Sequence, residues 1–294
     1  MKASESKQGI MTSVDLKKPS NKIIYTGIVL LLIIVCLISA IPIIWILFSG
    51  FKAPSEMYKI PPSFFPEKID LSKLSTAWKQ MKFYKYYINT FIVAGGSTAC
   101  GLLFCGLAGY VLSKLKPIGN SVINIIFFWS MLIPTTMATV PIYMSIIKVP
   151  IIGLNLSNSY IPLWLMCVDA FNVILFKSFF DGIPNSVIES AKIDGASTLR
   201  VFFKIVIPMS LPVFMTVAIF TFNGTMGQYF WPYLLISDNS MTVLGVQLYK
   251  MKSSTLSTDY QMLAIIFSII PQVIIFAIFQ KNIVGGISIG AVKG

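Results

Sequence analysis

Long uninterrupted apolar runs constrain this chain more than any other feature of its sequence. The 294 residues are 55% hydrophobic and only 12% charged, whereas about a quarter of the residues in a typical soluble domain are charged. A run of roughly 20 apolar residues is long enough to cross a bilayer as a helix, which satisfies its own backbone hydrogen bonds. The sequence therefore predicts an all-α polytopic membrane protein.

Six of these runs are expected to span the membrane. They occupy residues 23–48, 88–113, 121–147, 160–180, 205–236 and 261–283. The fifth run is too long for one straight crossing and contains Pro208, Pro212 and Pro232, so we expect it to be broken. The third run contains Pro134 and Pro141, and the threonines beside them are typical of a repaired helix break.

The distribution of basic residues sets the expected orientation. Lys and Arg in short loops favour the cytoplasmic side, and they are slightly more frequent on the side that holds both termini. We therefore expect a cytoplasmic tail over residues 1–22, a transmembrane domain over 23–283 and a second cytoplasmic tail over 284–294. The first run is too long for a signal-peptide core. The net charge of +12 comes from Lys and Arg residues that we expect to orient the spans and to contact membrane lipids. Nucleic acid is therefore not an expected partner.

Residues that could carry out chemistry are sparse. The chain has no His, and its four cysteines lie inside apolar runs, so we expect neither a metal site nor catalytic residues. No G-x-x-x-x-G-K-[ST] phosphate loop occurs, so the chain cannot itself be an ATPase of the type that uses that loop. A membrane enzyme would need clustered His, Cys, Asp or Glu at a membrane face, which the sequence does not offer.

One polar stretch, ESAKIDGASTLRVFFKIVIP, separates the fourth and fifth runs. Ser186 followed by Glu189 predicts a capping box, Gly195 predicts a helix end, and Ser197 or Thr198 could cap a second helix. The second helix would carry an apolar stripe formed by Leu199, Phe202, Phe203, Val206 and Ile207. This stripe needs a surface to bury against, which could be the chain's own bundle, the membrane surface or a groove on a cytoplasmic partner.

The spacing of this stretch resembles the EAA loop of ABC-importer permeases. Glu189-Ser190-Ala191, Gly195, Ile205, Ile207 and Pro208 occupy the positions of that motif, with Ser for Ala and Ile for Leu as departures. The resemblance implies the six-helix ABC type I importer fold, with residues 184–208 as coupling helices that dock on an ATP-binding subunit. The residues it assigns to docking are Glu189, Ser190, Ala191, Asp194, Gly195, Ala196, Leu199, Phe202 and Phe203.

Four further stretches resemble the second permease subunit of carbohydrate importers, the maltose-type family. They are SGFKAPSEM after the first run, YINT at the start of the second, AGYVLSKLK at its end, and the closing GISIGAVKG. The resemblance implies that the substrate is a sugar, oligosaccharide or glycoside. One departure lies before Trp231, where this chain has Met226-Gly227-Gln228 instead of the family's Trp-Asn-Asp.

The same resemblance implies the partners and the location. These are a second homologous permease, two ATP-binding subunits that use ATP and Mg, and an extracytoplasmic solute-binding protein, in a bacterial cell membrane with no cofactor bound by this chain. The tail residues Gly290, Ala291 and Lys293 would lie near the ATPases. The alternatives are an ABC permease for another solute, such as amino acids, phosphate or peptides, and an ion-coupled secondary transporter, in which Asp169 could be the proton site.

Polar residues inside the apolar runs are the candidates for a translocation path. A carboxylate at mid-membrane usually faces a cavity or a partner, and Asp169 with Asn172 could either line the path or form an interhelical hydrogen bond. The full candidate set is Asp169, Asn172, Asn223, Gln228, Tyr229 and Trp231. The lysines of the first outer loop could meet an acidic face of the binding protein or simply be solvated; they are Lys52, Lys59, Lys68, Lys73, Lys79, Lys82 and Lys85.

Overall fold

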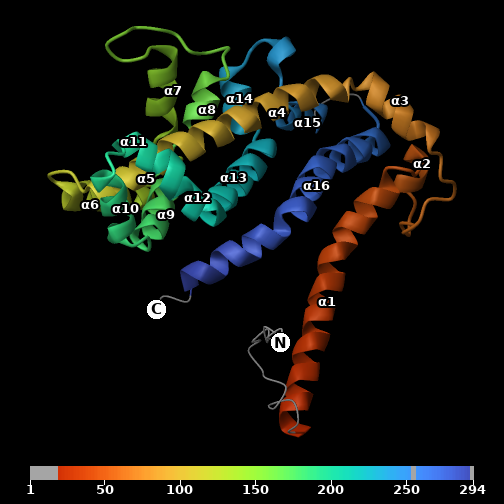
Figure 1. Cartoon of the computed structure of the whole chain (residues 1–294). Coiled ribbons are helices and arrows are strands. Elements are labelled where there is room, and N and C mark those ends of the chain that lie inside the picture. Colours follow the sequence, from red (N-terminus) through yellow and green to blue (C-terminus); the bar gives the residue numbers. More distant parts are fainter. Residues whose placement is uncertain (1–18, 253–255, 292–294) are drawn as a thin grey trace. The chain divides into compact units, whose positions relative to one another are not determined.

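The computed structural model describes residues 19–252 and 256–291, and every regular element within these ranges is a helix (Figure 1). This confirms the all-α prediction. The chain divides into two compact units. Among the described residues, the first comprises 19–73 and 257–266, and the second comprises 74–252, 256 and 267–291.

The first unit is built around the end of helix α1 (Pro19–Ser49), the short helix α2 (Pro54–Met57) and the first turns of α16 (Thr258–Ala291). Gly50 lies against α16 so closely that an added Cβ would be 2.8 Å from a methyl group of Leu263. Large apolar side chains along α1 are exposed, as expected for a helix that meets lipid or another protein.

Within the part of the chain that the structure describes, three helical stretches are long and apolar enough to cross a membrane, namely residues 21–49, 83–115 and 258–279. A fourth candidate is a pair of helical segments, residues 198–209 and 211–226, which meet at an angle of 84°. The predicted break in the fifth run is thus confirmed, and it falls at Ser210, between Pro208 and Pro212. Helix α16 continues to Ala291, beyond residue 283, where the sequence places the end of the last span and the start of a tail.

The second predicted span is continuous but not uniformly α-helical. It consists of α4 (Phe83–Cys100), η2 (Gly101–Cys105), α5 (Gly106–Tyr110) and η3 (Val111–Leu115), where η2 and η3 are π-helical turns. Gly109 lets this span approach α9 (Ala170–Asp181). A Cβ at Gly109 would lie 2.7 Å from the Cβ of Phe176 and 2.9 Å from the backbone nitrogen of Lys177. Small residues therefore permit close helix packing here.

The third and fourth predicted spans are each divided into two helices, the third at a predicted break and the fourth at a break that the sequence analysis did not predict. The third comprises α6 (Asn120–Leu132) and α7 (Thr139–Ile147), separated at Pro134 as predicted. Backbone turns close this break, with the Met137 nitrogen donating to the Pro134 carbonyl at 3.0 Å. The fourth comprises α8 (Ile161–Leu165) and α9.

The remaining elements are helix α13, which forms the second half of the bent fifth span, and a set of shorter helices. They are α3 (Ser72–Gln80), α10 (Asn185–Ile193), α11 (Thr198–Val201), η4 (Phe202–Val206), α12 (Ile207–Met209), α13 (Leu211–Met226), α14 (Phe230–Leu235), η5 (Asn239–Met241) and α15 (Leu244–Lys252). One apolar cluster joins α5, α9, α10, η4 and α13. Another joins α8, α14 and α15 to α4.

Candidate functional site

The helix pair α10–α11 turns at Gly195, which has φ +79°. The Gly195 nitrogen donates to the Lys192 carbonyl at 3.0 Å, and the Ala196 nitrogen donates to the Ala191 carbonyl at 2.9 Å. These two bonds are a Schellman motif, in which a residue with positive φ ends the helix and satisfies its last carbonyls. The predicted need for a permissive residue at Gly195 is confirmed, because a side chain is strained in this conformation.

The cap residues of the pair agree only partly with the sequence prediction. Ser197 precedes α11, and its Oγ accepts from the Arg200 nitrogen at 3.4 Å, which confirms it as the cap of the second helix. The predicted capping box of Ser186 and Glu189 is wrong. Helix α10 begins at Asn185 after Pro184, with no side-chain cap bond. Pro184 pre-sets an extended entry into the helix, so Ser186 already lies in its first turn.

The docking candidates divide into a buried set and an exposed set. Ala191 and Phe202 belong to the apolar cluster of the chain's own bundle, together with Ile188, Val201 and Val206. The exposed candidates are Glu189, Ser190, Asp194, Gly195, Leu199 and Phe203, while Ala196 is half-buried. The predicted single stripe from Leu199 to Ile207 is therefore wrong. The π-helical turn η4 changes the number of residues per turn, so Phe202 packs inward while Phe203 is 48% exposed.

Ile193 is a surface residue of this pair that the sequence reasoning missed. Its side chain is 86% exposed, and the neighbouring exposed apolar side chains on the pair are Leu199 at 61% and Phe203 at 48%. Exposed large apolar residues on a short polar segment indicate a surface that another molecule covers. The signal was present in the sequence, because Ile193 stands between Lys192 and Asp194 on a helix too short to bury it.

Hydrogen bonds tie the pair to the second span. The Lys114 Nζ donates to the Ile183 carbonyl at 2.6 Å and to Asn185 Oδ1 at 3.0 Å. One residue earlier, Ser113 Oγ donates to Asp181 Oδ1 at 2.6 Å. The AGYVLSKLK stretch thus holds both the end of α9 and the start of α10. The pair is consequently attached to η3 as well as to its own chain neighbours.

The side chains of Asp169 and Asn172 hydrogen-bond to each other. Asp169 caps α9, with Oδ1 accepting from the Asn172 nitrogen at 2.8 Å and Oδ2 accepting from Asn172 Nδ2 at 2.7 Å. Both carboxylate oxygens are thus engaged at the start of one helix, and neither path lining nor an interhelical bond is needed to account for them. The carboxylate instead stabilises the helix start that follows the break in span four.

Helix α13, which carries Asn223 of the second candidate set, contacts this break. Cys167, within the break, has its sulfur 3.8 Å from Thr225 Oγ1 of α13. Asn223 lies on the same helix, and its Oδ1 is buried without a hydrogen-bond partner in the part of the chain that the structure describes. The break at 166–169 and the end of α13 are thus in contact. In the sequence analysis, the candidates in these two segments were two unconnected sets.

The residues after α13 have different environments. Gln228 lies in the bend between α13 and α14, and Trp231 packs into the apolar cluster of α8 and α14. Tyr229 is 44% exposed, and its ring stacks on Tyr249 with centroids 5.1 Å apart. Tyr249 is a further candidate that the sequence reasoning missed. Of the tail candidates, Gly290 and Ala291 end α16, and Lys293 lies outside the described residues.

Three lysines of the first outer loop are engaged within the chain. Lys52 is buried, with Nζ 4.1 Å from the centre of the Trp45 ring. Lys59 pairs with Glu67, and Lys73 pairs with Asp259. Lys52, Lys59 and Lys73 are thus held by contacts within the chain, whereas Lys68, Lys79 and Lys82 are exposed.

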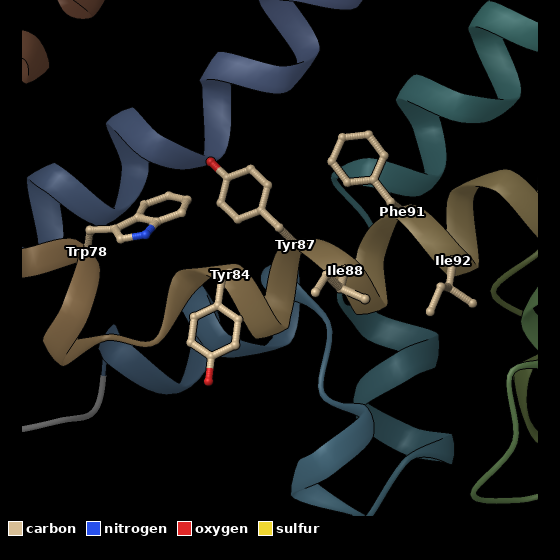
Figure 2. Close-up of a pocket in the computed structure, with 6 residues that line it drawn as sticks. All are labelled: Trp78, Tyr84, Tyr87, Ile88, Phe91 and Ile92. Carbon is tan, nitrogen blue, oxygen red and sulfur yellow. The ribbon is translucent and has the colours of Figure 1, made fainter.

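An apolar groove of about 600 Å³ runs along α4. Figure 2 shows its lining residues, which are Trp78, Tyr84, Tyr87, Ile88, Phe91 and Ile92. The Tyr87 hydroxyl donates to the Phe267 carbonyl. No amide, amine or carboxylate side chain belongs to this lining, so the groove suits an apolar contact and does not suit a hydroxyl-rich ligand.

Comparison with known proteins identifies the fold. The family described as binding-protein-dependent transport system inner membrane component matches residues 101–289. A solved structure of a bacterial ABC transporter involved in the import of the acidic polysaccharide alginate aligns with a TM-score of 0.77 and 25% identity, covering 90% of this chain and 98% of that one.

Two curated relatives are similar over almost their whole length. The diacetylchitobiose uptake system permease protein NgcG of Streptomyces coelicolor is 30% identical over 90% of this chain and 87% of the relative. The arabinooligosaccharides transport system permease protein AraQ of Bacillus subtilis is 26% identical over 94% of this chain and 98% of the relative. The chain therefore belongs to the family of binding-protein-dependent transport system inner membrane components.

Proposed function

We propose that this chain is the transmembrane permease subunit of an ATP-driven ABC importer for a sugar, oligosaccharide or glycoside. The relatives named above carry diacetylchitobiose and arabinooligosaccharide transport in their names, and a further relative from Bacillus subtilis is named for melibiose, raffinose and stachyose import. The chain lies in a bacterial cell membrane with both termini in the cytoplasm. It works with a second homologous permease, two ATP-binding subunits and an extracytoplasmic solute-binding protein.

The observation that carries this proposal is the helix pair α10–α11. It presents exposed Ile193, Leu199 and Phe203 around a rigid Schellman turn, while its other face is buried in the apolar cluster of the bundle. A short helix that is apolar on both faces is suited to fill a groove on a partner with one face and transmit force through the other. Glu189 and Asp194 lie at the rim of the exposed face, where they could pair with basic groups.

Coupling then follows from the contacts of the pair. ATP hydrolysis belongs to the partner subunits, whose closure moves the docked pair. The bonds of Lys114 and Ser113 pass this displacement to the second span, and Ile188 and Phe202 pass it to α9 and α13 through the shared apolar cluster. Because packed helices move as bodies and do not deform continuously, the movement reorients the spans between the two sides of the membrane.

The test is co-purification of tagged protein from its native membrane, with partners identified by mass spectrometry, together with uptake of radiolabelled sugars. We expect a second permease and an ATP-binding subunit to be recovered with the unaltered chain. Gly195→Val should lose the ATP-binding subunit, because a non-glycine residue at positive φ costs about 1–2 kcal/mol and a β-branched residue costs more.

Gly195→Asn is the matched control, because Asn tolerates the left-handed region and no atom lies within 4 Å of the added Cβ. It should retain the ATP-binding subunit. A chain that purifies alone, with uptake that ignores ATP depletion and stops on addition of an uncoupler, would overturn the proposal in favour of an ion-coupled transporter. ATP-dependent uptake of amino acids, phosphate or peptides without any sugar would overturn the substrate class alone.

A further inference from the structure

Three tyrosines at the end of span five form an exposed aromatic cluster. Tyr229 and Tyr249 stack with centroids 5.1 Å apart and an interplanar angle of 17°, and Tyr233 meets Tyr249 edge-on at 5.4 Å. The exposed fractions of Tyr229, Tyr233 and Tyr249 are 44%, 48% and 47%. Burying aromatic surface is the main gain that a core aromatic provides, so these stacked rings retain surface on which a further molecule can pack.

The backbone is arranged to hold this cluster in place. The Tyr233 nitrogen donates to the Tyr229 carbonyl at 2.9 Å, which places these two rings one helical turn apart on α14. Gly245 brings α15 against the bend before α14. A Cβ at this position would lie 2.6 Å from the Gln228 carbonyl oxygen. Tyr249 follows Gly245 by four residues and so projects from the same face of α15.

Helix α15 is itself fixed on α4. Asn89 Nδ2 donates to the carbonyls of Ser240 and Thr242, each at 2.8 Å. The Thr90 hydroxyl accepts from the Leu244 nitrogen at 2.8 Å, which satisfies the first turn of α15. The YINT stretch, which the sequence could only match to a family pattern, therefore anchors the helix that carries Tyr249. The aromatic cluster is pre-organised before any ligand arrives.

We propose that Tyr229, Tyr233 and Tyr249 form a stacking surface for a pyranosyl ring of the transported oligosaccharide. A pyranose has an apolar face of C–H groups that packs against an aromatic ring, and its hydroxyls need polar groups nearby. Gln228, which is half-buried and directly precedes Tyr229, is the polar side chain adjacent to the cluster in sequence. This inference rests on the proposed function and names a contact of this subunit with its substrate.

The alternative uses of an exposed tyrosine cluster are anchoring at the membrane surface and docking of the binding protein. An aromatic anchor at the membrane surface uses the polar hydroxyl as well as the apolar ring, so Tyr249→Phe and Tyr249→Leu should both weaken it. A stacked sugar depends on the flat ring itself, so replacement by Leu and by Phe separates the two explanations.

The experiment uses the whole importer with its binding protein, reconstituted in liposomes, and measures both sugar uptake and ATP hydrolysis. Diacetylchitobiose, an arabinooligosaccharide and raffinose are offered first to the unaltered importer, and the sugar that is transported serves as the probe. We expect Tyr249→Ala and Tyr249→Leu to lower the amount of sugar transported per ATP hydrolysed by about tenfold, the fold-change that corresponds to 1.4 kcal/mol. Tyr249→Phe should stay within about twofold of the unaltered importer, a margin of about 0.4 kcal/mol.

Tyr84→Ala is the matched control, since Tyr84 is an exposed tyrosine on another helix; it should leave the ratio unchanged. Recovery of the complete complex on a sizing column verifies that each variant assembles. The inference is overturned if Tyr249→Leu transports as well as Tyr249→Phe, or if uptake and ATP hydrolysis fall together, which indicates a structural or docking role. If the unaltered importer moves none of the sugars, the proposed function fails, and that failure is seen before any variant is compared.

Discussion

Both carboxylate oxygens of Glu56, a residue of α2, accept hydrogen bonds from backbone nitrogens of the segment that follows α1. Its Oε2 accepts from the Glu67 nitrogen at 3.0 Å, and its Oε1 accepts from the Ala53 nitrogen at 3.3 Å. The hydrogen bond from the Glu67 backbone is the main reason that the pKa of the Glu56 carboxyl is lowered, and the Ala53 nitrogen, Lys59 and Lys52 add to the effect against the opposing influence of burial.

This lowered pKa predicts an acid sensitivity. A carboxyl whose pKa is lower in the folded state stabilises the fold above its unfolded pKa, and this stabilisation is lost as the pH falls through the folded pKa. The unfolding temperature of the unaltered protein should therefore exceed that of Glu56→Gln at pH 7, and the difference should shrink as the pH falls below the usual value of 4.5. Thermal unfolding in detergent at several pH values measures this.

Glu67→Gln is the control for this measurement, because Glu67 is exposed and an exposed ion pair contributes little. A difference between Glu56→Gln and the unaltered protein that stays constant from pH 7 to pH 4 would contradict the assignment.

Asp169 permits a second prediction at the residue scale, because both of its oxygens are engaged by Asn172. Loss of a helix cap costs about 0.5–2 kcal/mol, so Asp169→Ala should lower the unfolding temperature. Asp169→Asn keeps a capping oxygen and should retain uptake. Abolished uptake in a stable Asp169→Asn protein would show that the carboxylate carries a proton, which the ion-coupled alternative requires.

At the scale of elements, the close packing of α5 on α9 makes a sharp prediction. Gly109→Ala should destabilise the protein by about 1–3 kcal/mol, because forcing extra atoms into a packed interface costs that much and the nearest atoms to the new Cβ include backbone atoms of Lys177 and Val173. Gly101→Ala on the same span should be mild, because its new Cβ would lie at an ordinary 3.5 Å from the Cys167 carbonyl oxygen.

Thermal unfolding of the two glycine variants side by side measures the difference. Equal unfolding temperatures would mean that α5 and α9 are not as close as described.

Elements whose bounds are set by nearby residues could be predicted from the sequence. Elements whose bounds depend on contacts with distant residues could not. The apolar runs predicted α1, α4 and α16, and Pro208 and Pro212 predicted the bend at Ser210, since these depend on nearby residues. The break in span four was missed because Asp169 looks like a buried polar residue until its cap is seen. The inward turn of Phe202 was missed because the π-helical turn η4 has no sequence signal of its own.

At the scale of the whole molecule, one ion pair joins parts of the first unit that are far apart in sequence. Lys73 Nζ lies 2.5 Å from Asp259 Oδ2 and donates to the Lys52 carbonyl at 2.7 Å. The end of the first apolar run and the start of the last are thereby linked through Lys73. The Asp259 side chain is only 2% exposed, so removing its partner would leave a buried charge.

Breaking this pair should therefore be costly. Lys73→Met alone should destabilise the protein by about 3–5 kcal/mol, as measured when one partner of a buried pair is removed. The double variant Lys73→Met with Asp259→Leu should recover a large part of this loss, because no unpaired charge remains. Unfolding measurements on the single and double variants test this, and additive losses would show that the two side chains do not interact.

The bonds from Ser113 and Lys114 to the joint between α9 and α10 have a mechanical consequence. A helix pair attached to the bundle at a single point could rotate about that point, and a force applied to it would then cause only local rotation. The pair α10–α11 is attached at two points, to α9 through the chain and to the second span through Ser113 and Lys114. A force on the pair therefore moves both of these helices. If the pair α10–α11 receives the stroke of an ATPase, spans two and four must therefore start to move together, whichever of them meets the substrate.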